Sequence, residues 1–540
     1  MVLAGCSGAA PVIQPQVPAP PPPAPDAAIL VDAPPPLALR GEACSEAHTC
    51  APELACFTAP GGYCTSACGL AGTVCPDGTC VATARSGEQC LKSCTRDADC
   101  RTPEGYFCDA QWHACLIPNT AAIVTNRCPA AAGPARDAAF AASAELSSVA
   151  TPGLSQLDPS AVITETGDLL ALFGSRRGVA DPGQLGSALV TAKGVVPTGF
   201  PVDAGDRGEV QLARDTKGIL YAVWLEAEGH HRQISLARSR DGGKTWTGPD
   251  RVDAADCTER DPACLDRPMI AIGAASPSTG EDRIHVLYAA GGGVRVATSH
   301  DEGSTFRAAI TAITGHHGNA TVGADGRLHL VALDPGTSVP GYGSADHRIV
   351  YTVSADGGET FAKAQRLSGR DEVLPFYASN PSVAIDPKRG FTYAAYVRGG
   401  RDAIWDLVIL ASKDKGKTWK RTRIGDAPAC AIHMVPSLAL DPTTGTLHVA
   451  WYDNRGGAGR FAHATCPAGA ATCTQKGAIN DLPFAALTAE RDTPRSIGDT
   501  AVLIVDDKRR VLHAVWAQPI DEGGKIVARI FHAAAKLPKK

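Results

Sequence analysis

The chain has 540 residues, with 56 glycines, 40 prolines and a formal net charge of −5. This length exceeds one ordinary domain, and the many glycines and prolines suit short strands joined by turns. The mild negative charge, without a dense Lys/Arg cluster, excludes nucleic acid as an expected partner, and no apolar run reaches the ~20 residues of a transmembrane helix.

The N-terminal region indicates export. Nineteen cysteines, thirteen of them from Cys44 to Cys128, suit an oxidising compartment. Residues 1–6 end in Leu-Ala-Gly-Cys, which resembles the lipobox of bacterial lipoprotein precursors. The resemblance implies that Cys6 is lipidated and anchors the protein to the bacterial cell envelope, at the outer membrane or cell surface, with no other membrane contact. A chance match in an Ala-rich leader is the alternative.

Three segments precede the main domain. Residues 7–40 are rich in Pro and Ala and form an extended linker. Residues 41–128 are a cysteine-rich module with few large aliphatic residues, so cross-links must stabilise it. Residues 129–147 are Ala-rich and form a linker or a short helix.

The cysteines of the module favour disulfides over metal. No Cys-x2-Cys pair is present, and we therefore expect six disulfides among the first twelve cysteines. The spacing Cys64-x3-Cys68-x6-Cys75 resembles Cys90-x3-Cys94-x5-Cys100, which suggests two related knots.

One eight-residue pattern recurs four times, every 55 to 60 residues. Each copy holds Ser, Asp, Gly, Thr and an aromatic residue at the same offsets. The Asp carboxylate can accept hydrogen bonds from backbone N–H groups two or three residues on, and the Gly supplies a left-handed conformation. Each copy is interpreted as the tip of a β-hairpin, and hairpin repeats of this period are typical of propeller blades. Structural roles are therefore expected for Asp241, Asp301, Asp356 and Asp414.

A second pattern predicts the number of blades. An apolar strand, a tight turn and a strand rich in β-branched and aromatic residues recur in seven units, which begin near Asp158, Glu209, Arg267, Asn319, Asn380, Val435 and Gly498. The predicted fold class is all-β, with residues 148–540 forming a β-propeller of four-stranded blades. Seven blades are favoured, and six are the alternative if the unit at Asp158 or Gly498 is incomplete. Residues 145–149 are expected to supply the outer strand of the last unit and close the ring.

Histidines and the remaining cysteines fit this architecture. His285, His329, His448 and His513 recur on the second strands, where equivalent positions on different blades lie too far apart to share a metal. Packing or hydrogen bonding between blades is the expected role. Two cysteine pairs close small loops, which leaves a long-range pair; the three pairs are Cys257 with Cys264, Cys466 with Cys473, and Cys128 with Cys430.

The four Ser-x-Asp-x-Gly-x-Thr-aromatic copies resemble the Asp-boxes, or BNR repeats, of the sialidase superfamily, over much of residues 150–535. The resemblance implies structural Asp-boxes and ligand binding at the opposite ends of the strands. Residues just before the first strands are placed there, among them Asp158, Asp266, Arg267, His317 and Asn380. The ligand-binding candidates at this mouth are Arg176, Arg177, Arg267, Arg398, Arg455, Arg495, Asp266, Glu226 and Asp453. Arginine can hold a carboxylate with two parallel hydrogen bonds, so an acidic or polyhydroxylated ligand is expected.

Catalysis is the less favoured reading. The catalytic set that the resemblance to sialidases implies has three arginines, an Asp as the acid and a Tyr nucleophile paired with a Glu. By resemblance, Arg176 or Arg177 and Arg495 match the arginines, and Asp181 matches the acid. Gln156-Leu157-Asp158-Pro159 replaces the Arg-Ile-Pro signature, and Ser496-Ile497-Gly498 offers no Tyr.

The sequence therefore predicts a cell-envelope-anchored, sialidase-like propeller that binds glycan or protein ligands without catalysis. A sialidase-like exo-acting glycoside hydrolase with Asp181 as acid is the alternative, and a purely structural protein-interaction scaffold is the second. We expect a monomer with no cofactor and no metal.

Overall fold

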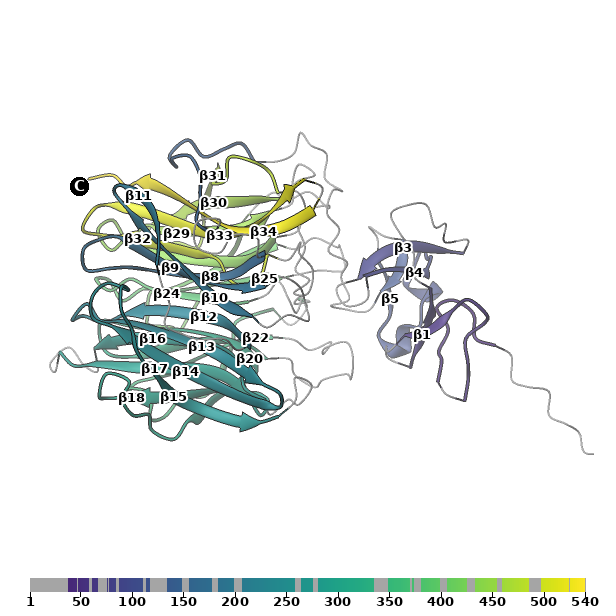
Figure 1. The fold of residues 1–540 in the computed structure, drawn as a ribbon. Coiled ribbons are helices and arrows are strands. Elements are labelled where there is room, and N and C mark those ends of the chain that lie inside the picture. The colour runs from purple at the N-terminus through teal and green to yellow at the C-terminus, as the bar shows by residue number, and fades with distance from the viewer. Residues whose placement is uncertain are drawn as a thin grey trace, which may run out of the picture. The chain divides into compact units, whose positions relative to one another are not determined.

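The structure is a computed structural model (Figure 1). Among the residues that it describes, no helix has the length and apolarity to cross a membrane. The described residues are 37–45, 47–57, 61–66, 75, 77–83, 87–109, 113–116, 134–147, 155–176, 183–198, 206–257, 264–274, 280–334, 348–369, 372, 380–398, 406–424, 433–453, 459–484, 497–523 and 525–539.

The described part of the cysteine-rich module contains three two-stranded antiparallel sheets and two short 3-10 helices. The paired strands are β1 (Ala55–Phe57) with β2 (Tyr63–Thr65), β3 (Gly78–Thr83) with β4 (Gly87–Lys92), and β5 (Phe107–Asp109) with β6 (Ala114–Leu116). The helices are η1 (Asp97–Asp99) and η2 (Thr102–Glu104). Its apolar core is small and contains Tyr63, Val81, Tyr106 and Phe107.

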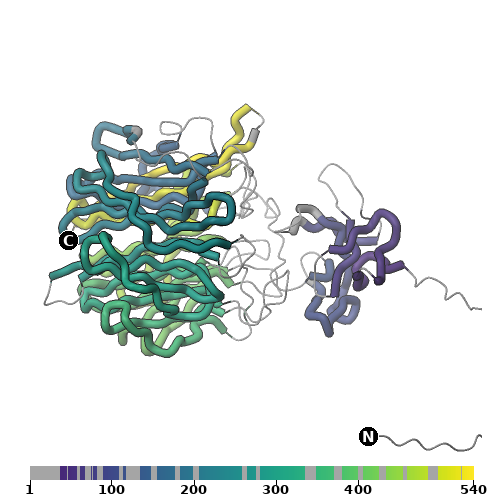
Figure 2. The backbone as a smooth tube through the Cα atoms, turned by 60° about the horizontal axis from the view of Figure 1, so that its bottom comes forward, coloured from purple at the N-terminus to yellow at the C-terminus, as the bar shows by residue number. Residues whose placement is uncertain are grey.

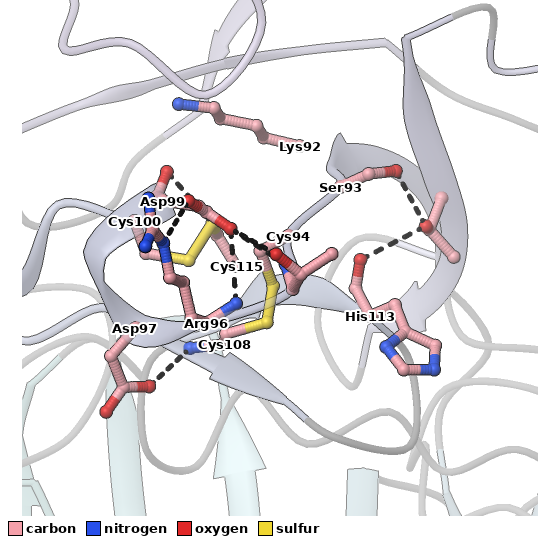
Figure 3. The surroundings of a disulfide bond; sticks show 12 residues. Lys92, Ser93, Cys94, Arg96, Asp97, Asp99, Cys100, Cys108, His113 and Cys115 are labelled. Atoms are coloured by element: carbon pink, nitrogen blue, oxygen red, sulfur yellow. Dashed lines mark hydrogen bonds and ion pairs between the residues drawn. A yellow bond between two sulfur atoms is a disulfide. The ribbon is translucent and has the colours of Figure 1, made fainter.

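Disulfides stabilise this module, as predicted. Interleaved bridges occur near both ends, and a further one lies between them: Cys44–Cys56 with Cys50–Cys64, Cys94–Cys108 with Cys100–Cys115, and Cys75–Cys90. The interleaving relates Cys94 and Cys100 to Cys44 and Cys50, not to Cys68 and Cys75 as the spacing suggested. Polar loops surround the second pair, where Asp97 accepts the N–H of Cys108 at 2.9 Å (Figure 3).

The rest of the described chain is a seven-bladed β-propeller of four-stranded sheets, as favoured from the sequence. Blade one contains β8 (Ser155–Ile163), β9 (Leu169–Arg176), β10 (Gln184–Thr191) and β11 (Gly194–Pro197). Blade two contains β12 (Asp206–Arg214), β13 (Leu220–Glu228), β14 (His231–Ser239) and β15 (Thr247–Asp256). Blade three contains β16 (Asp266–Ala274), β17 (Asp282–Ala290), β18 (Gly293–Ser299) and β19 (Ile310–Thr314). Blade four contains β20 (His316–Val322), β21 (Leu328–Asp334), β22 (Arg348–Ser354) and β23 (Gln365–Arg366). Blade five contains β24 (Ser382–Ile385), β25 (Thr392–Arg398), β26 (Asp406–Ser412) and β27 (Lys420–Ile424). Blade six contains β28 (His433–Leu440), β29 (Leu447–Asp453), β30 (Arg460–Cys466) and β31 (Thr474–Ala478).

Blade seven closes the ring with a strand from the other end of the domain. Its sheet runs β32 (Val502–Asp506), β33 (Val511–Glu522), β34 (Lys525–Lys536) and β7 (Ala144–Glu145). β7 pairs antiparallel with β34, which confirms the predicted closure. The C-terminal strands, in yellow, therefore lie beside the first blade, in blue (Figures 1 and 2).

The propeller begins earlier than the predicted boundary at residue 148. The Ala478 N–H donates to the Ala135 carbonyl and the Asp137 N–H to the Ala478 carbonyl, each at 2.7 Å. Phe140 is buried in the core and forms a bridge with Ala535. Residues 134–147 of the expected linker thus belong to the propeller, because they cover blades six and seven.

The blades pack through large side chains on both faces. Trp224, Trp451 and Trp516 are fully buried, and the Trp516 ring stacks on Phe461 of blade six at 5.5 Å. Such aromatic contacts add to the area that the blades bury. Two loop disulfides, Cys257–Cys264 and Cys466–Cys473, have the predicted pairing, whereas Cys128 and Cys430 lie outside the described residues.

The hydrogen bonds of these histidines lie within blades, while His285 also packs toward the next blade, where a Cβ added at Gly358 would lie 3.0 Å from its Nδ1. His285 Nδ1 lies 3.0 Å from Thr298 Oγ1, and His329 Nδ1 lies 2.6 Å from the Tyr351 hydroxyl, each on the third strand of the same blade. His513 contacts His532 in the same way at 2.9 Å. Burial lowers the pKa of His285 to about 3 and that of His329 to about 4, so both are neutral at physiological pH.

The four repeated turns, called the Asp turns below, join third to fourth strands in blades two to five. The Ser hydroxyl donates to the Asp carboxylate at 2.8, 2.8, 2.7 and 2.7 Å and accepts the N–H of the Gly four residues on. In all four, the carboxylate accepts the Thr N–H four residues on. Asp241 and Asp356 also accept the N–H three residues on, as predicted.

The glycine of each Asp turn meets the preceding blade. Gly243 has φ +91°, and a Cβ there would lie 2.7 Å from a Leu170 methyl group; Gly416 would meet the Tyr351 hydroxyl at 2.2 Å. Glycine is therefore needed both for the left-handed backbone and for the close approach of the two blades.

Candidate functional site

The candidate site lies at the strand ends opposite the Asp turns. Adjacent strands in every blade are antiparallel, so the connections from third to fourth strands and the starts of the inner strands lie at opposite ends. The inner strands line the central channel of a propeller, and their first residues form its mouth.

A β-bulge near the start of the inner strand turns one residue toward the channel. The register shifts in β8, β12, β16, β20 and β28. The bulged residues have positive φ, between 49° and 55°, although none is a glycine. They are Asp158, Glu209, Arg267, His317 and Val435. Such conformations each cost about 1 kcal/mol or more and concentrate at functional sites.

Serines two residues after the bulge join neighbouring blades. Ser160 Oγ accepts the Leu212 N–H of blade two, and Ser437 Oγ accepts the Leu503 N–H of blade seven, both at 2.9 Å. These hydrogen bonds hold adjacent inner strands together and thereby fix the positions of the bulged residues around the channel.

A cavity of about 230 Å³ lies between these inner strands. All five bulged residues line it, together with Asn380, Asp499 and the apolar side chains of Met269, Val383, Leu438 and Val502. A lining that combines apolar side chains with a few polar groups is common in small-molecule sites, where the polar groups orient the ligand.

The polar residues of the mouth contact one another across blades. Glu209 accepts the Arg267 N–H at 2.8 Å, and Asp158 accepts the Asp499 N–H at 2.5 Å. The Arg267 guanidinium pairs with Asp499 at 2.5 Å and lies 3.5 Å from Asp266. The Asn380 side-chain amide donates to the Asp499 carbonyl at 2.8 Å. Five blades therefore contribute to one hydrogen-bonded network.

Of the predicted ligand-binding residues, Arg267 lines the cavity, and Asp266 forms an ion pair with Arg267. The other described candidates pair within or beside their own blades. Arg398 binds Asp406 at 2.9 Å with both side chains buried, and Arg176 lies 3.3 Å from Asp206. Arg177, Asp181, Arg455, Arg495 and Cys6 lie outside the described residues.

Two predicted carboxylates pair with tryptophan. The Trp224 indole donates to Glu226 at 2.7 Å, and the Trp451 indole donates to Asp453 at 3.3 Å. Asp453 is fully buried, so it cannot meet a ligand in this conformation. An indole and a carboxylate two residues apart face the same side of the strand, which explains both pairs.

Glu209, Asp499 and Val435 were missed from the sequence. Part of the signal is the dipeptide Pro-Ser, which follows Asp158, Asn380 and Val435 at the start of the inner strand. Glu209 and Asp499 lack that dipeptide, and only the register of the blades aligns them with the others.

Tyrosine–carboxylate pairs occur away from the cavity. The Tyr396 hydroxyl donates to Glu372 at 2.7 Å, but Tyr396 is fully buried between blades four and five. None of the residues lining the described cavity is tyrosine. Among the described residues, the only groups with metal-ligand spacing are cysteines already joined in disulfides.

No protein-family model and no curated protein sequence matches the chain. Several solved structures are similar to it at low identity. A Dyadobacter fermentans DSM 18053 protein of unknown function is 13% identical with a TM-score of 0.43, covering 74% of this chain and 99% of that chain. The α-L-arabinofuranosidase Arb93A from Fusarium graminearum is 13% identical with a TM-score of 0.42, covering 74% of this chain and 98% of that chain. The Hadza microbial sialidase Hz136 is 17% identical with a TM-score of 0.38, covering 58% of this chain and 66% of that chain.

Proposed function

We propose that this protein is an exported, envelope-anchored propeller that binds a glycan at the mouth of its central channel without hydrolysing it. The observation that carries the proposal is the ring of bulged residues around the cavity. Five of the seven blades have the same backbone bulge there but present different side chains, which is expected of a ligand site rather than of a structural element.

The composition of the ring suits hydroxyl groups. Asp158, Glu209 and Asp499 offer carboxylate acceptors, and Asn380 offers an amide. Sugars present many O–H donors, and hydrogen bonds to charged acceptors are stronger than neutral ones. The apolar residues of the lining complete a surface on which one face of a sugar ring can pack.

The binding proposal is tested on a glycan panel. We expect the full chain to retain one class of glycan, and Glu209→Ala to weaken that binding at least about tenfold through loss of a carboxylate at the mouth. Glu302→Ala is the matched control, since Glu302 lies in an Asp turn and pairs with Lys217 and Arg240. Binding that is equally reduced by both variants, or by neither, contradicts the proposed site.

Glycoside hydrolysis is the second candidate, because several carboxylates line one cavity and hydrolysis uses two. Turnover of fluorogenic glycosides that Asp181→Ala or Glu209→Gln abolishes would favour it. The envelope anchor is tested by mass spectrometry of the membrane fraction, where a lipid on Cys6 is expected and an unmodified Cys6 contradicts the anchor.

A further inference from the structure

Exposed lysines gather at the Asp-turn end of blades five and seven, on either side of blade six. They come from the two turns of blade five at this end, from the turn between β32 and β33, and from the end of the chain at β34. The six residues, called the lysine face below, are Lys388, Lys413, Lys417, Lys508, Lys536 and Lys539. None of them forms an ion pair with another described residue. They lie far apart along the chain, so the mild net charge of the sequence does not indicate them.

Contacts between blades join these turns into one sector of the ring. Arg389 donates to the Thr444 carbonyl of blade six at 3.2 Å. The Thr443 hydroxyl donates to Asp507 of blade seven at 2.7 Å. Lys536, the last residue of β34, pairs with the first residue of β33, beside the same turn. The positive charges therefore face one common surface.

The carboxylates of this sector do not offset the lysines at the surface. Three of the five are buried in their turns, namely Asp386, Asp441 and Asp506. Asp507 is exposed but pairs with Arg510 at 3.1 Å, and Asp414 is held inside its Asp turn. Among the strand connections at this end, only residues 275–279 of blade three are not described, and they contain no charged residue.

The variable positions of the Asp turns show how this sector differs from the others. Blade five has Lys413, Lys415 and Lys417 there, whereas blade three has His300, Glu302 and Ser304. Glu302 pairs with Lys217 of blade two at 2.7 Å, and Arg307 pairs with Glu359 of blade four. In blade five only Lys415 has such a partner, Asp325. Charges in blades two to four thus pair across blades, and those of the lysine face remain available.

The chemistry of the lysine face suits a surface of phosphate groups. An ammonium group is a compact, hydrated charge without the fixed fork of a guanidinium, so it fits a diffuse layer of phosphates better than one oriented anion. Each basic residue near an anionic bilayer increases membrane binding several-fold, within about one Debye length. Such a surface commonly acts as a second membrane signal beside a covalent lipid.

We propose that the lysine face docks on the anionic phospholipid headgroups of the membrane to which a lipid on Cys6 anchors the chain. This inference rests on the envelope anchor of the proposed function. The glycan mouth lies at the opposite ends of the strands, so docking turns it away from the bilayer and toward ligands outside. A flexible linker and a lipid alone set no orientation. The lysine face adds a second membrane contact to the one expected at Cys6.

Vesicle co-sedimentation tests this with the full chain carrying Cys6→Ser, so that no lipid on Cys6 contributes. The vesicles contain phosphatidylcholine alone, or equal parts of phosphatidylcholine and phosphatidylglycerol. At low ionic strength we expect binding at least about tenfold tighter to the vesicles with phosphatidylglycerol. Added salt should weaken it, because the attraction is screened. Equal binding to both vesicles, or binding to neither, overturns the inference.

Two double variants with the same change in net charge locate the surface. Lys388→Glu with Lys417→Glu should weaken binding to phosphatidylglycerol vesicles at least about tenfold. Lys193→Glu with Lys244→Glu, on exposed lysines of blades one and two, should weaken it less than about threefold. Lys244 has the same position in its Asp turn as Lys417. Equal losses in both double variants contradict a localised lysine face.

The glycan panel keeps this inference separate from the proposed glycan site. Both double variants should bind glycan as the unaltered chain does, which also shows that they are folded. Vesicle binding without glycan binding contradicts the glycan site and supports the lysine face. An oligogalacturonate distinguishes a soluble acidic polymer from a membrane. If it binds at Lys388 and Lys417 while the vesicles do not bind, the partner is an acidic polymer and the inference is wrong.

Discussion

The two ends of the propeller strands differ in how the blades repeat. At one end, four Asp turns repeat the same hydrogen bonds with nearly the same distances. At the other end, equivalent bulges present Asp158, Glu209, Arg267, His317 and Val435, which have little chemistry in common. Repetition serves contacts that every blade needs with its neighbour, whereas variation arises where all blades face one shared space. Changes at the turn end should therefore alter stability, and changes at the mouth should alter binding.

The largest expected effect on stability is at Arg510. Arg510 holds the buried Asp441 of blade six with two hydrogen bonds of 2.6 and 2.7 Å. Arg510→Met should lower the free energy of unfolding by about 3 kcal/mol, because Asp441 keeps a buried charge without its partner. Denaturant titration measures this loss. Arg307→Met, at an ion pair whose arginine is 57% exposed, is the control and should change stability by less than about 1 kcal/mol.

An Asp turn comes next. Asp301 accepts hydrogen bonds from the hydroxyls of Ser299 and Thr305 and from the Thr305 N–H, at 2.8, 2.6 and 2.9 Å. Asp301→Ala should cost about 2 kcal/mol of unfolding free energy and leave glycan affinity unchanged. Asp256→Ala, on an exposed carboxylate, should cost less than about 0.5 kcal/mol. A large loss of affinity in Asp301→Ala would contradict the separation of the two ends.

The dependence of stability on pH is the third prediction. Burial lowers the pKa of His329 from 6.5 to about 4, so its neutral form stabilises the fold above pH 6.5 and this contribution is lost as pH falls toward 4. Side-chain and backbone hydrogen bonds from Thr305 lower the pKa of Asp301 from 3.8 to about 2, so its contribution is lost only below pH 4.

Unfolding midpoints from pH 7 to pH 3 measure both losses. The slope between pH 6 and pH 4 should reach up to about 1.4 kcal/mol per pH unit for each buried histidine. His329→Gln should reduce this slope, and His231→Gln, on an exposed histidine, should not. A flat profile above pH 4 would show that the buried histidines titrate normally.

The smallest effect on stability is expected at the mouth. Asn380→Ala removes one hydrogen bond, from Nδ2 to the Asp499 carbonyl, and should lower the free energy of unfolding by less than about 1 kcal/mol. Glycan affinity should nevertheless fall about tenfold, because the Oδ1 acceptor is lost with it. Calorimetry and denaturation on the same sample separate the two quantities. A variant that loses stability but binds glycan normally would show that Asn380 has a structural role and no binding role.

The sequence was informative where interactions are local. The Asp turns span eight residues, so their hydrogen bonds could be anticipated from residue types and offsets alone. The pairing of the two short loop disulfides followed for the same reason. Ring closure by Glu145 was predictable because the last unit lacked an outer strand and the chain had one unused apolar segment.

The site was harder to predict because its residues are remote from one another. Arg398 and Arg176 have the residue type and the position in the blade that are expected of ligand-binding residues. Each nevertheless forms an ion pair with a carboxylate close by, Arg398 with Asp406 and Arg176 with Asp206. Nothing in the residue types distinguishes them from Arg267, which does reach the cavity. The difference lies in which side of the strand each one occupies and in what the neighbouring blade offers.

The sequence by itself determined the all-β class, the seven blades, the Asp turns and the disulfide-stabilised module, because each depends on a periodic or short-range pattern. Only the tertiary structure decided the chemistry of the mouth. Arg267 and Asp499 are separated by 232 residues and meet because ring closure brings blades three and seven to the same channel. That contact pairs the one arginine of the described lining with a carboxylate of another blade.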